Sequence, residues 1–186
     1  MQWKNGKTGY GWFSILLHWA VALLVFGLFG LGLWMVDLGY YDAWYQRAPW
    51  WHKGLGVTML ALVLVRLAWR RANPVPRPMA GHAAWEVRLS RAVHRLFYLL
   101  LLLLALTGYL MVTAAGDGLE VFDWFVIPAT LSDVDGQEDL AGDLHRWLAW
   151  TTVGLAGLHA AGALKHHLLD RDATLKRMLR PGPDVT

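Results

Sequence analysis

The amino-acid sequence predicts an all-α integral membrane protein, and three observations support this fold class: composition, the length of the apolar runs, and the placement of charge. Hydrophobic residues make up 56% of the 186 positions, charged residues 17%, and the mean hydropathy is +0.33, which is typical of membrane proteins. Four apolar stretches are each long enough to cross a hydrocarbon core, which takes about 20 helical residues. Lys and Arg gather on one side of these stretches. We therefore expect a four-helix bundle that spans the membrane as a single domain.

The expected helices lie at about 13–36, 52–69, 93–115 and 144–169, with a cap loop at 116–143 and a tail at 170–186. The first helix follows Lys4 and Lys7, as the apolar part of a secretory signal peptide would. Its apolar run is too long for a signal peptide, however, and no small-x-small cleavage pattern is evident. The second helix ends at the proline-rich segment 73–78, because prolines lack an amide donor and restrict the residues before them.

The loop charges predict the orientation in the membrane. The N-terminal segment, the region 66–95 and the chain from Lys165 onward hold 14 of the 17 Lys and Arg residues. Cytoplasmic loops carry such an excess of cations, so we expect a multi-pass protein of a bacterial inner (cell) membrane with both termini in the cytoplasm. The region 117–143 contains eight acidic residues and no Lys or Arg. We expect this cap loop to face the periplasm.

The sequence contains no cysteine. Disulfides, iron–sulfur clusters, cysteine-ligated zinc and covalent haem attachment through a C-x-x-C-H motif are therefore excluded. Any cofactor must be held by histidine or by packing.

Histidines inside the apolar stretches are informative, because a histidine within a membrane span is unfavourable and rare. His18 lies near the inner end of the first expected helix and His52 at the outer start of the second. His145 and His159 both lie on the fourth, fourteen residues apart. That spacing is four helical turns less about 40°, so both rings project from nearly the same face, about 21 Å apart along the axis.

Topology pairs these histidines by depth. The second helix descends from the outside, which puts His52 level with His145, and the first rises from the inside, which puts His18 near the level of His159. An iron with two imidazoles is six-coordinate and has no open position for oxygen, so a haem held in this way suits electron transfer. We therefore predict two non-covalent haems between the helices.

The histidines have two alternative roles. Each ring could be hydrogen-bonded within the bundle or seated at an interface, although four rings at two matched depths argue against this. Zinc also binds imidazole, but the pairs lack further carboxylate or cysteine ligands at suitable spacing. Glycines accompany the histidines, and they allow either close backbone approach to a haem or helix–helix packing. These are Gly27, Gly30, Gly32, Gly54, Gly56, Gly154, Gly157 and Gly162.

Several motifs resemble those of the bacterial cytochrome b561 family. They are His18-Trp19, His52, His145, Gly157-Leu158-His159-Ala160-Ala161, Lys165-His166-His167 and Asp172-Ala173-Thr174-Leu175-Lys176-Arg177-Met178. The resemblance spans essentially the whole chain and is strongest in the fourth helix and its tail. Within the family, the sequence looks closest to the superoxide:ubiquinone oxidoreductases, also called superoxide oxidases.

The resemblance implies a four-helix bundle with two molecules of haem b, the outer ligated by His52 and His145 and the inner by His18 and His159. This is the pairing that depth predicts. The resemblance further implies an enzyme in which superoxide at the periplasmic face gives an electron to the outer haem. That electron would pass to the inner haem and then to ubiquinone on the cytoplasmic side, with molecular oxygen and ubiquinol as products.

Lys53, Arg146 and Arg47 are the cations expected on the outer side. Positive charge raises the encounter rate of a small anion such as superoxide. Lys53 and Arg146 adjoin the outer histidines, and we take them as candidate catalytic residues, with neutralisation of haem propionates as their alternative role. The acidic region 117–143 counts against simple steering, because its field repels an anion.

On the inner side, quinone reduction needs polar groups for the quinone carbonyls and a supply of protons. His166, His167 and Arg77 are candidates for quinone binding or proton delivery, and their alternative role is to mark the headgroup boundary. Arg66, in the inner half of the second helix, could bond a haem propionate or snorkel to the interface. His94 could line the quinone pocket, but we favour an interfacial position.

A second function stays open at the level of the sequence. The chain could be a dihaem anchor subunit that shuttles electrons between a soluble dehydrogenase or hydrogenase and the quinone pool, without a substrate of its own. A copurifying redox partner protein would favour this reading. A third possibility, a membrane scaffold without haem, predicts no Soret band.

Overall fold

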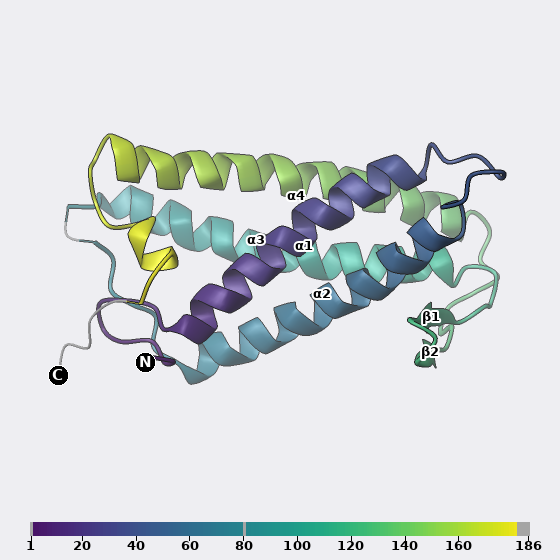
Figure 1. Cartoon of the computed structure of the whole chain (residues 1–186), viewed down its shortest axis with the longest axis horizontal. Helices are drawn as coiled ribbons and strands as arrows, with labels where there is room; N and C mark the ends of the chain where they lie inside the picture. The colour runs from purple at the N-terminus through teal and green to yellow at the C-terminus, as the bar shows by residue number, and fades with distance from the viewer. Residues whose placement is uncertain (1, 80, 182–186) are drawn as a thin grey trace. The chain divides into compact units, whose positions relative to one another are not determined.

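The computed structural model describes residues 2–79 and 81–181. Its elements are the helices α1 (Trp12–Met35), α2 (Arg47–Ala72), α3 (Ala84–Val112) and α4 (Gln137–Leu168), the strands β1 (Leu119–Val121) and β2 (Phe125–Ile127), and the 3-10 helix η1 (Lys176–Met178) (Figure 1). Apart from the short β1–β2 hairpin, all regular structure in the described residues is helical. The prediction of an all-α chain with four long helices is confirmed.

The chain forms two compact units, and each long helix contributes a segment to both. Unit 1 contains the described residues within 1–22, 62–97 and 154–186, and unit 2 contains residues 23–61 and 98–153. His18 and His159 belong to unit 1, whereas His52 and His145 belong to unit 2. Each histidine pair predicted from the sequence therefore falls within a single unit.

Three helices begin earlier than the apolar pattern predicted. The observed starts are Arg47 for α2, Ala84 for α3 and Gln137 for α4, against predicted starts at 52, 93 and 144. Apolar residues mark only the part of a helix that suits hydrocarbon, whereas the backbone hydrogen bonds continue into polar flanks. At the start of α3, for example, the Glu86 carboxylate accepts a hydrogen bond from the Ala83 backbone N–H at 3.0 Å and caps the helix. His52 consequently lies inside α2 and not at its start.

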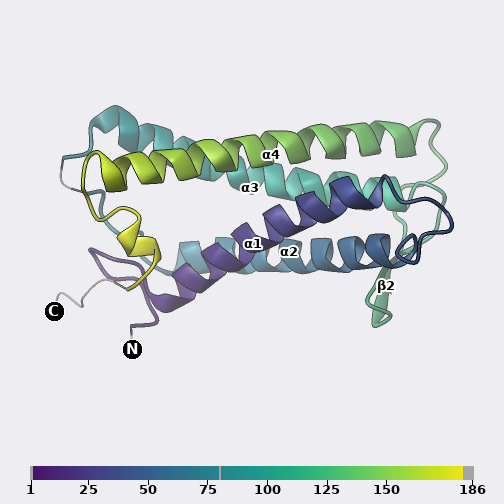
Figure 2. The same cartoon turned by 45° about the horizontal axis from the view of Figure 1, so that its top comes forward.

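The predicted cap loop at 116–143 is shorter than expected and contains the β1–β2 hairpin, which Figure 2 shows from a second side. The strands are antiparallel, and Phe122 and Asp123 form the turn with positive φ angles of 49° and 59°. Packing holds this unfavourable backbone in place. The Phe122 ring lies 5.2 Å from that of Trp50, whose indole N–H donates to Asp123 Oδ1 at 3.1 Å. Within unit 2, the hairpin is thus docked on the start of α2.

Large apolar side chains cover the outer faces of the helices. Leu23, Trp147 and Leu158 are 71%, 67% and 73% exposed, whereas Val63 and Thr152 are each only 1% exposed. An apolar surface of this extent is unfavourable in water and favourable against lipid chains. The faces that carry these residues are therefore suited to contact with lipid.

α1 and α3 are the helices whose length and apolar composition suit a membrane span, among the residues that the structure describes. α2 and α4, with 26 and 32 residues, are also long enough but are less apolar. Both helices have charged ends, with Arg70 and Arg71 in the last turn of α2 and Glu138 and Asp139 in the first turn of α4. Ionisable residues in membrane helices usually face the interior of a bundle and mark functional sites. The candidate site residues on these helices, which also lower their hydropathy, are His52, Lys53, Arg66, His145, Arg146 and His159.

Gly54 in α2 leaves room for the Phe122 ring, and a Cβ atom at this position would overlap that ring. We expect Gly54→Ala to loosen the hairpin, because overpacking costs about 1–3 kcal/mol. Amide hydrogen exchange at residues 119–127 should be roughly ten- to a hundredfold faster. Gly27→Ala is the matched control, since a Cβ at Gly27 meets nothing within 4 Å. Unchanged exchange in Gly54→Ala would contradict this account of the docking.

Candidate functional site

In unit 2, α2 and α4 bring the rings of His52 and His145 together. Their centroids are 6.2 Å apart and their planes are inclined by 70°. The Nδ1 atom of His145 lies 3.0 Å from the Leu104 backbone carbonyl. A carbonyl can only accept, so Nδ1 carries the proton, and Nε2 keeps the lone pair that a metal needs. A hydrogen bond from the ring nitrogen that does not bind the metal commonly fixes the tautomer and orientation of a metal-binding histidine.

His52 has no equivalent bond. Its Nδ1 atom is buried and has no hydrogen-bond partner among the described residues. Buried polar atoms are nearly always paired, and an unpaired one needs an explanation. A hydrogen bond within the bundle therefore does not explain the burial of this Nδ1 atom, and the ligand role of His52 stays a prediction.

A cavity of about 890 Å³ adjoins both rings within unit 2. This volume lies in the range of cofactor and ligand pockets, roughly 300–1,000 Å³. Most of its lining is apolar, as the ring of a porphyrin requires, and its charged residues are Lys53, Arg146, Glu138, Asp139 and Asp143. The cavity and the two histidines together have the properties of a haem pocket.

Two glycines give the rings their space. A Cβ at Gly32 would lie 3.3 Å from Cε1 of His52, and a Cβ at Gly108 would lie 3.2 Å from Cε1 of His145. In contrast, a Cβ at Gly27 or Gly30 would meet nothing within 4 Å. Sequence reasoning singled out the glycines of the first helix as a group and missed Gly108, because its proximity to His145 depends on the packing of α3 against α4.

In unit 1, α1 and α4 bring His18 and His159 together, with ring centroids 6.4 Å apart and planes inclined by 74°. Two further rings surround His159: His94 at 5.3 Å and Phe97 at 5.7 Å between centroids. His94, for which the sequence favoured an interfacial position, lies beside a candidate ligand because α3 packs against α4 there.

Arg66 contacts the other ring of this pair. Its Nη2 atom lies 3.0 Å from Nδ1 of His18. A guanidinium only donates, so Nδ1 of His18 accepts in this arrangement. When His18 binds a metal through Nε2, Nδ1 carries the proton and Arg66 can no longer donate to it. Arg66 is thus placed in the inner site.

The ring separations fit one metal ion between each pair. Two metal–nitrogen bonds of about 2.0–2.1 Å place the centroids of opposed imidazoles about 6 Å apart, as in both pairs. In the described part of the chain, no group of three clustered metal-binding side chains includes any of these four histidines. Zinc with a protein-ligand shell of three or four is therefore disfavoured, and the donor sets fit haem.

Two of the three cations predicted for the outer side lie at the cavity of unit 2. Lys53 and Arg146 both border the cavity of unit 2. Arg146 is paired with Asp143 at 2.8 Å, and both side chains are about two-thirds exposed. Such an exposed pair contributes little to stability, but it offsets the positive charge of Arg146. Arg47 begins α2 and does not line the cavity.

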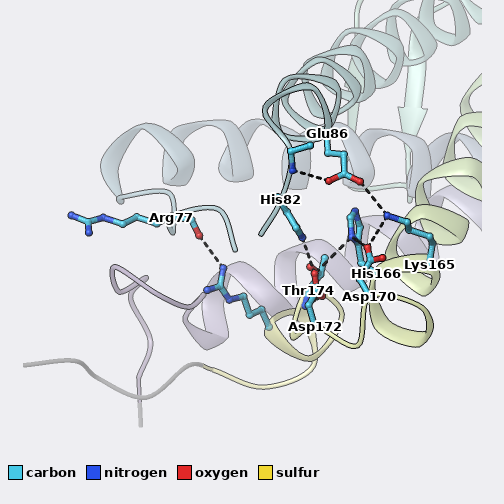
Figure 3. Close-up of polar contacts among 10 residues, drawn as sticks. Arg77, His82, Glu86, Lys165, His166, Asp170, Asp172 and Thr174 are labelled. Carbon is cyan, nitrogen blue, oxygen red and sulfur yellow. Dashed lines mark hydrogen bonds and ion pairs between the residues drawn. The ribbon is translucent and has the colours of Figure 1, made fainter. Parts of the chain in front are cut away.

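The residues predicted for a quinone site are not brought together. His166 bonds Asp170, whereas Nδ1 of His167 is buried without a partner in the described residues. The backbone carbonyl of Arg77 accepts a bond from Arg177 at 2.9 Å, and its side chain points away from His166 (Figure 3). In the described residues Arg77 therefore contacts the tail through its backbone carbonyl, and its side chain does not approach His166.

The sequence matches the family of prokaryotic cytochrome b561 over residues 9–181. The chain belongs to this family. It is therefore a membrane b-type cytochrome that carries electrons, and membership implies that it binds haem b.

Individual relatives refine this picture. Cytochrome b561 homolog 2 of Escherichia coli (strain K12) is 46% identical over 96% of this chain and 95% of its own length. Cytochrome b562 of Cereibacter sphaeroides is 31% identical over 94% and 98%. "Probable superoxide oxidase CybB" of Yersinia pestis is 29% identical over 91% and 95%. The sequence was expected to look closest to superoxide oxidases, but the relative with that name is less similar than cytochrome b561 homolog 2.

Gly108 provides a test of the outer site. We expect Gly108→Val to push the His145 ring out of position and to weaken haem binding at this pair by roughly tenfold or more, as changes around metal ligands do. The measurement is haem retained per chain after dilution into haem-free detergent. Gly30→Val is the control, because that position has open space. Equal retention in the two variants would contradict a site built around His145.

Proposed function

We propose that the chain holds two molecules of haem b, one between His52 and His145 and one between His18 and His159. We further propose that it carries electrons from superoxide on the periplasmic side to ubiquinone on the cytoplasmic side. The observation that carries the proposal is the near-equal ring separation of the pairs, 6.2 and 6.4 Å. When bound between two imidazoles, haem supplies one-electron transfer without an open position for oxygen.

The protein's own residues prepare both sites. The Leu104 carbonyl orients His145 through Nδ1, and α4 supplies one ligand to each pair. In the inner site, we propose that Arg66 turns from His18 toward a haem propionate, because ligation through Nε2 removes its acceptor on that ring. The positive charge of Arg66 would also offset the negative charge of the propionate, which is unfavourable in an apolar interior.

The charge distribution along the chain supports the orientation. We propose that both termini and the region 66–95 lie in the cytoplasm, because cytoplasmic segments carry an excess of Lys and Arg. His52 and His145 would then belong to the periplasmic end and His18 and His159 to the cytoplasmic end.

Superoxide is the proposed donor for two reasons. A relative of 29% identity is named as a probable superoxide oxidase, and Lys53 and Arg146 border the outer cavity. The balanced reaction oxidises two superoxide anions to two molecules of oxygen, and one ubiquinone takes up the two electrons and two protons to give ubiquinol. Attraction by Lys53 and Arg146 would raise the encounter rate of the anion. Asp143, which pairs with Arg146, reduces this attraction, as do Glu138 and Asp139, which also line the cavity.

Ubiquinone is proposed to accept the electrons near the inner pair. His94 lies beside His159. His166, which bonds Asp170, and the half-buried His167 lie in the last turn of α4. Imidazoles can bond quinone carbonyls and pass protons from water. Arg77 is the least supported of the predicted quinone residues, because its side chain is turned from His166.

The alternative is a dihaem anchor subunit that links a soluble dehydrogenase or hydrogenase to the quinone pool. One observation favours it: the hairpin carries exposed apolar side chains, with Trp124 at 81% and Val126 at 58% exposure. An exposed apolar tip suits a partner protein as well as lipid headgroups. The two functions share the haem sites and differ in the electron donor.

Haem quantitation tests the two sites. We expect about two haems per chain, and the loss of about one in His52→Ala and in His145→Ala, with no further loss in the double variant. His18→Ala and His159→Ala should together define the other site. His94→Ala, which removes the neighbour of His159 but no proposed ligand, should retain both haems. Fewer than two haems in the wild-type chain would sink the proposal of two sites.

A superoxide pulse with ubiquinone present tests the donor. We expect the isolated chain to reduce ubiquinone, and Lys53→Gln or Arg146→Gln to slow the reaction roughly two- to fivefold and to flatten its dependence on ionic strength. Arg88→Gln, an exposed cation of α3 outside either site, should behave as wild type. If the isolated chain reduces no ubiquinone but does so with a copurified dehydrogenase or hydrogenase, the anchor function replaces the enzyme.

A further inference from the structure

Unit 1 also contains a cluster of two histidines and an aspartate (Figure 3) that shares no residue with the proposed haem pairs. It consists of His82 in the segment before α3, His166 in the last turn of α4 and Asp172 in the segment that follows. One ligand atom from each of the three lies within 4.8 Å of the others. The sequence predicted His166 for quinone binding or proton delivery and Asp172 only as part of the tail motif, and it did not pair Asp172 with His82, because they are 90 residues apart.

The imidazoles of His82 and His166 both face one carboxylate oxygen of Asp172. Nε2 of His82 lies 2.7 Å and Nδ1 of His166 lies 3.7 Å from Oδ2 of Asp172. The other carboxylate oxygen, Oδ1, accepts a hydrogen bond from the Thr174 backbone N–H at 2.7 Å. That bond holds the carboxylate so that Oδ2 faces the two imidazoles. The imidazole rings pack with their centroids 4.4 Å apart.

We propose that His82, His166 and Asp172 bind a divalent transition-metal ion, for which Zn²⁺ is the probe. Two imidazole nitrogens and one carboxylate oxygen are a donor set that zinc accepts, with water in a fourth position. Bonds of about 2.0–2.2 Å set the ligand atoms of a tetrahedral ion roughly 3.3 Å apart. The three atoms therefore need only small side-chain rotations to reach that geometry.

The surrounding charges favour a dication. Asp170 accepts a bond from His166 at 2.7 Å, and Glu86 lies across from it, with Lys165 bonded to both carboxylates. With Asp172 included, three carboxylates face one lysine, and the histidines are neutral when they act as ligands. The net charge of two negatives matches that of Zn²⁺. Asp170 also lies close enough to His166 to replace the water.

The cluster is accessible but sheltered. The side chains of His82 and His166 are each 17% exposed, and that of Asp172 is 13% exposed. An ion can therefore enter from solvent, and its ligands need little further ordering. The bound ion would join the segment before α3 to the segment after α4, and it would replace the proton that His82 and Asp172 share. It would also withdraw His166 from any exchange of protons with a quinone.

Zinc binding by the haem-saturated full chain tests the proposal. The protein is purified through a tag without histidine, and bound zinc is measured by equilibrium dialysis and mass spectrometry, which haem absorbance does not disturb. We expect about one zinc per chain with a dissociation constant in the micromolar range or below, and an affinity lower by at least about tenfold in His82→Ala and in Asp172→Asn. Zinc-edge X-ray absorption should show imidazole and carboxylate scattering.

Asp135→Asn is the matched control, because it removes an exposed carboxylate that belongs to unit 2 and not to the cluster. This variant should bind zinc as the wild type does. Haem content and the haem spectrum report whether each variant is folded. Asp172→Asn keeps the size of the side chain, so it remains a test if His82→Ala does not fold. Equal zinc binding in wild type and Asp172→Asn, or a zinc spectrum without imidazole, would overturn the proposal. These readouts require neither superoxide nor quinone, so failure of the proposed function leaves them interpretable.

Discussion

An imidazole ring among apolar helices needs a partner, and the rest of the site is arranged around that constraint. Nδ1 of His145 has a backbone carbonyl, Nδ1 of His18 has Arg66, and Nδ1 of His52 has no partner in the described residues. For His145 the opposite ring nitrogen is left to a cofactor, whereas His18 must give up its bond from Arg66 before Nε2 can act as a ligand. The penalty for leaving polar atoms unpaired in a low-dielectric interior is about 1–3 kcal/mol each. Such a site is most stable when the cofactor is bound.

The same constraint accounts for the composition of the helices. α1 and α3 are the more apolar pair and expose large side chains suited to lipid. α2 and α4 carry three of the four paired histidines and the candidate site cations Lys53, Arg66 and Arg146, which lower their hydropathy. Glycine is used where a ring needs space, at Gly32 and Gly108, and not wherever glycine occurs in a helix. A glycine in these helices therefore matters to the site only where the helix backbone approaches a histidine ring.

The polar end of unit 1 is organised differently from the haem pairs. Charge-assisted hydrogen bonds join Lys165 to Glu86 and Asp170, and His82 to Asp172. The hydrogen bond from Lys165 keeps the pKa of the exposed Asp170 below its ordinary value. For Asp172, burial raises the pKa, but the hydrogen bonds from Thr174 and His82 outweigh it and lower the pKa overall. Both carboxylates therefore stay ionised at neutral pH, as ligands or proton acceptors must be.

The sequence by itself determined the fold class, the four apolar helices and the identity of the paired histidines. These follow from local quantities: hydropathy over about 20 residues, the helical repeat and the number of cations in each loop. Helix starts were misplaced because hydropathy reports the lipid-facing part and not the backbone hydrogen bonds that extend α2, α3 and α4. The β1–β2 hairpin was missed because its strands are only three residues long and its turn depends on packing against Trp50.

Only the tertiary structure decided which residues stand beside the rings. Gly108, His94 and the Leu104 carbonyl reach His145 or His159 from a different helix, and His82 meets Asp172 across 90 residues of chain. The tertiary structure also separated Arg77 from His166, which the sequence had grouped by topology. Contacts between residues distant in the chain depend on how the helices rotate about their axes and pack, and a single sequence carries no direct record of either.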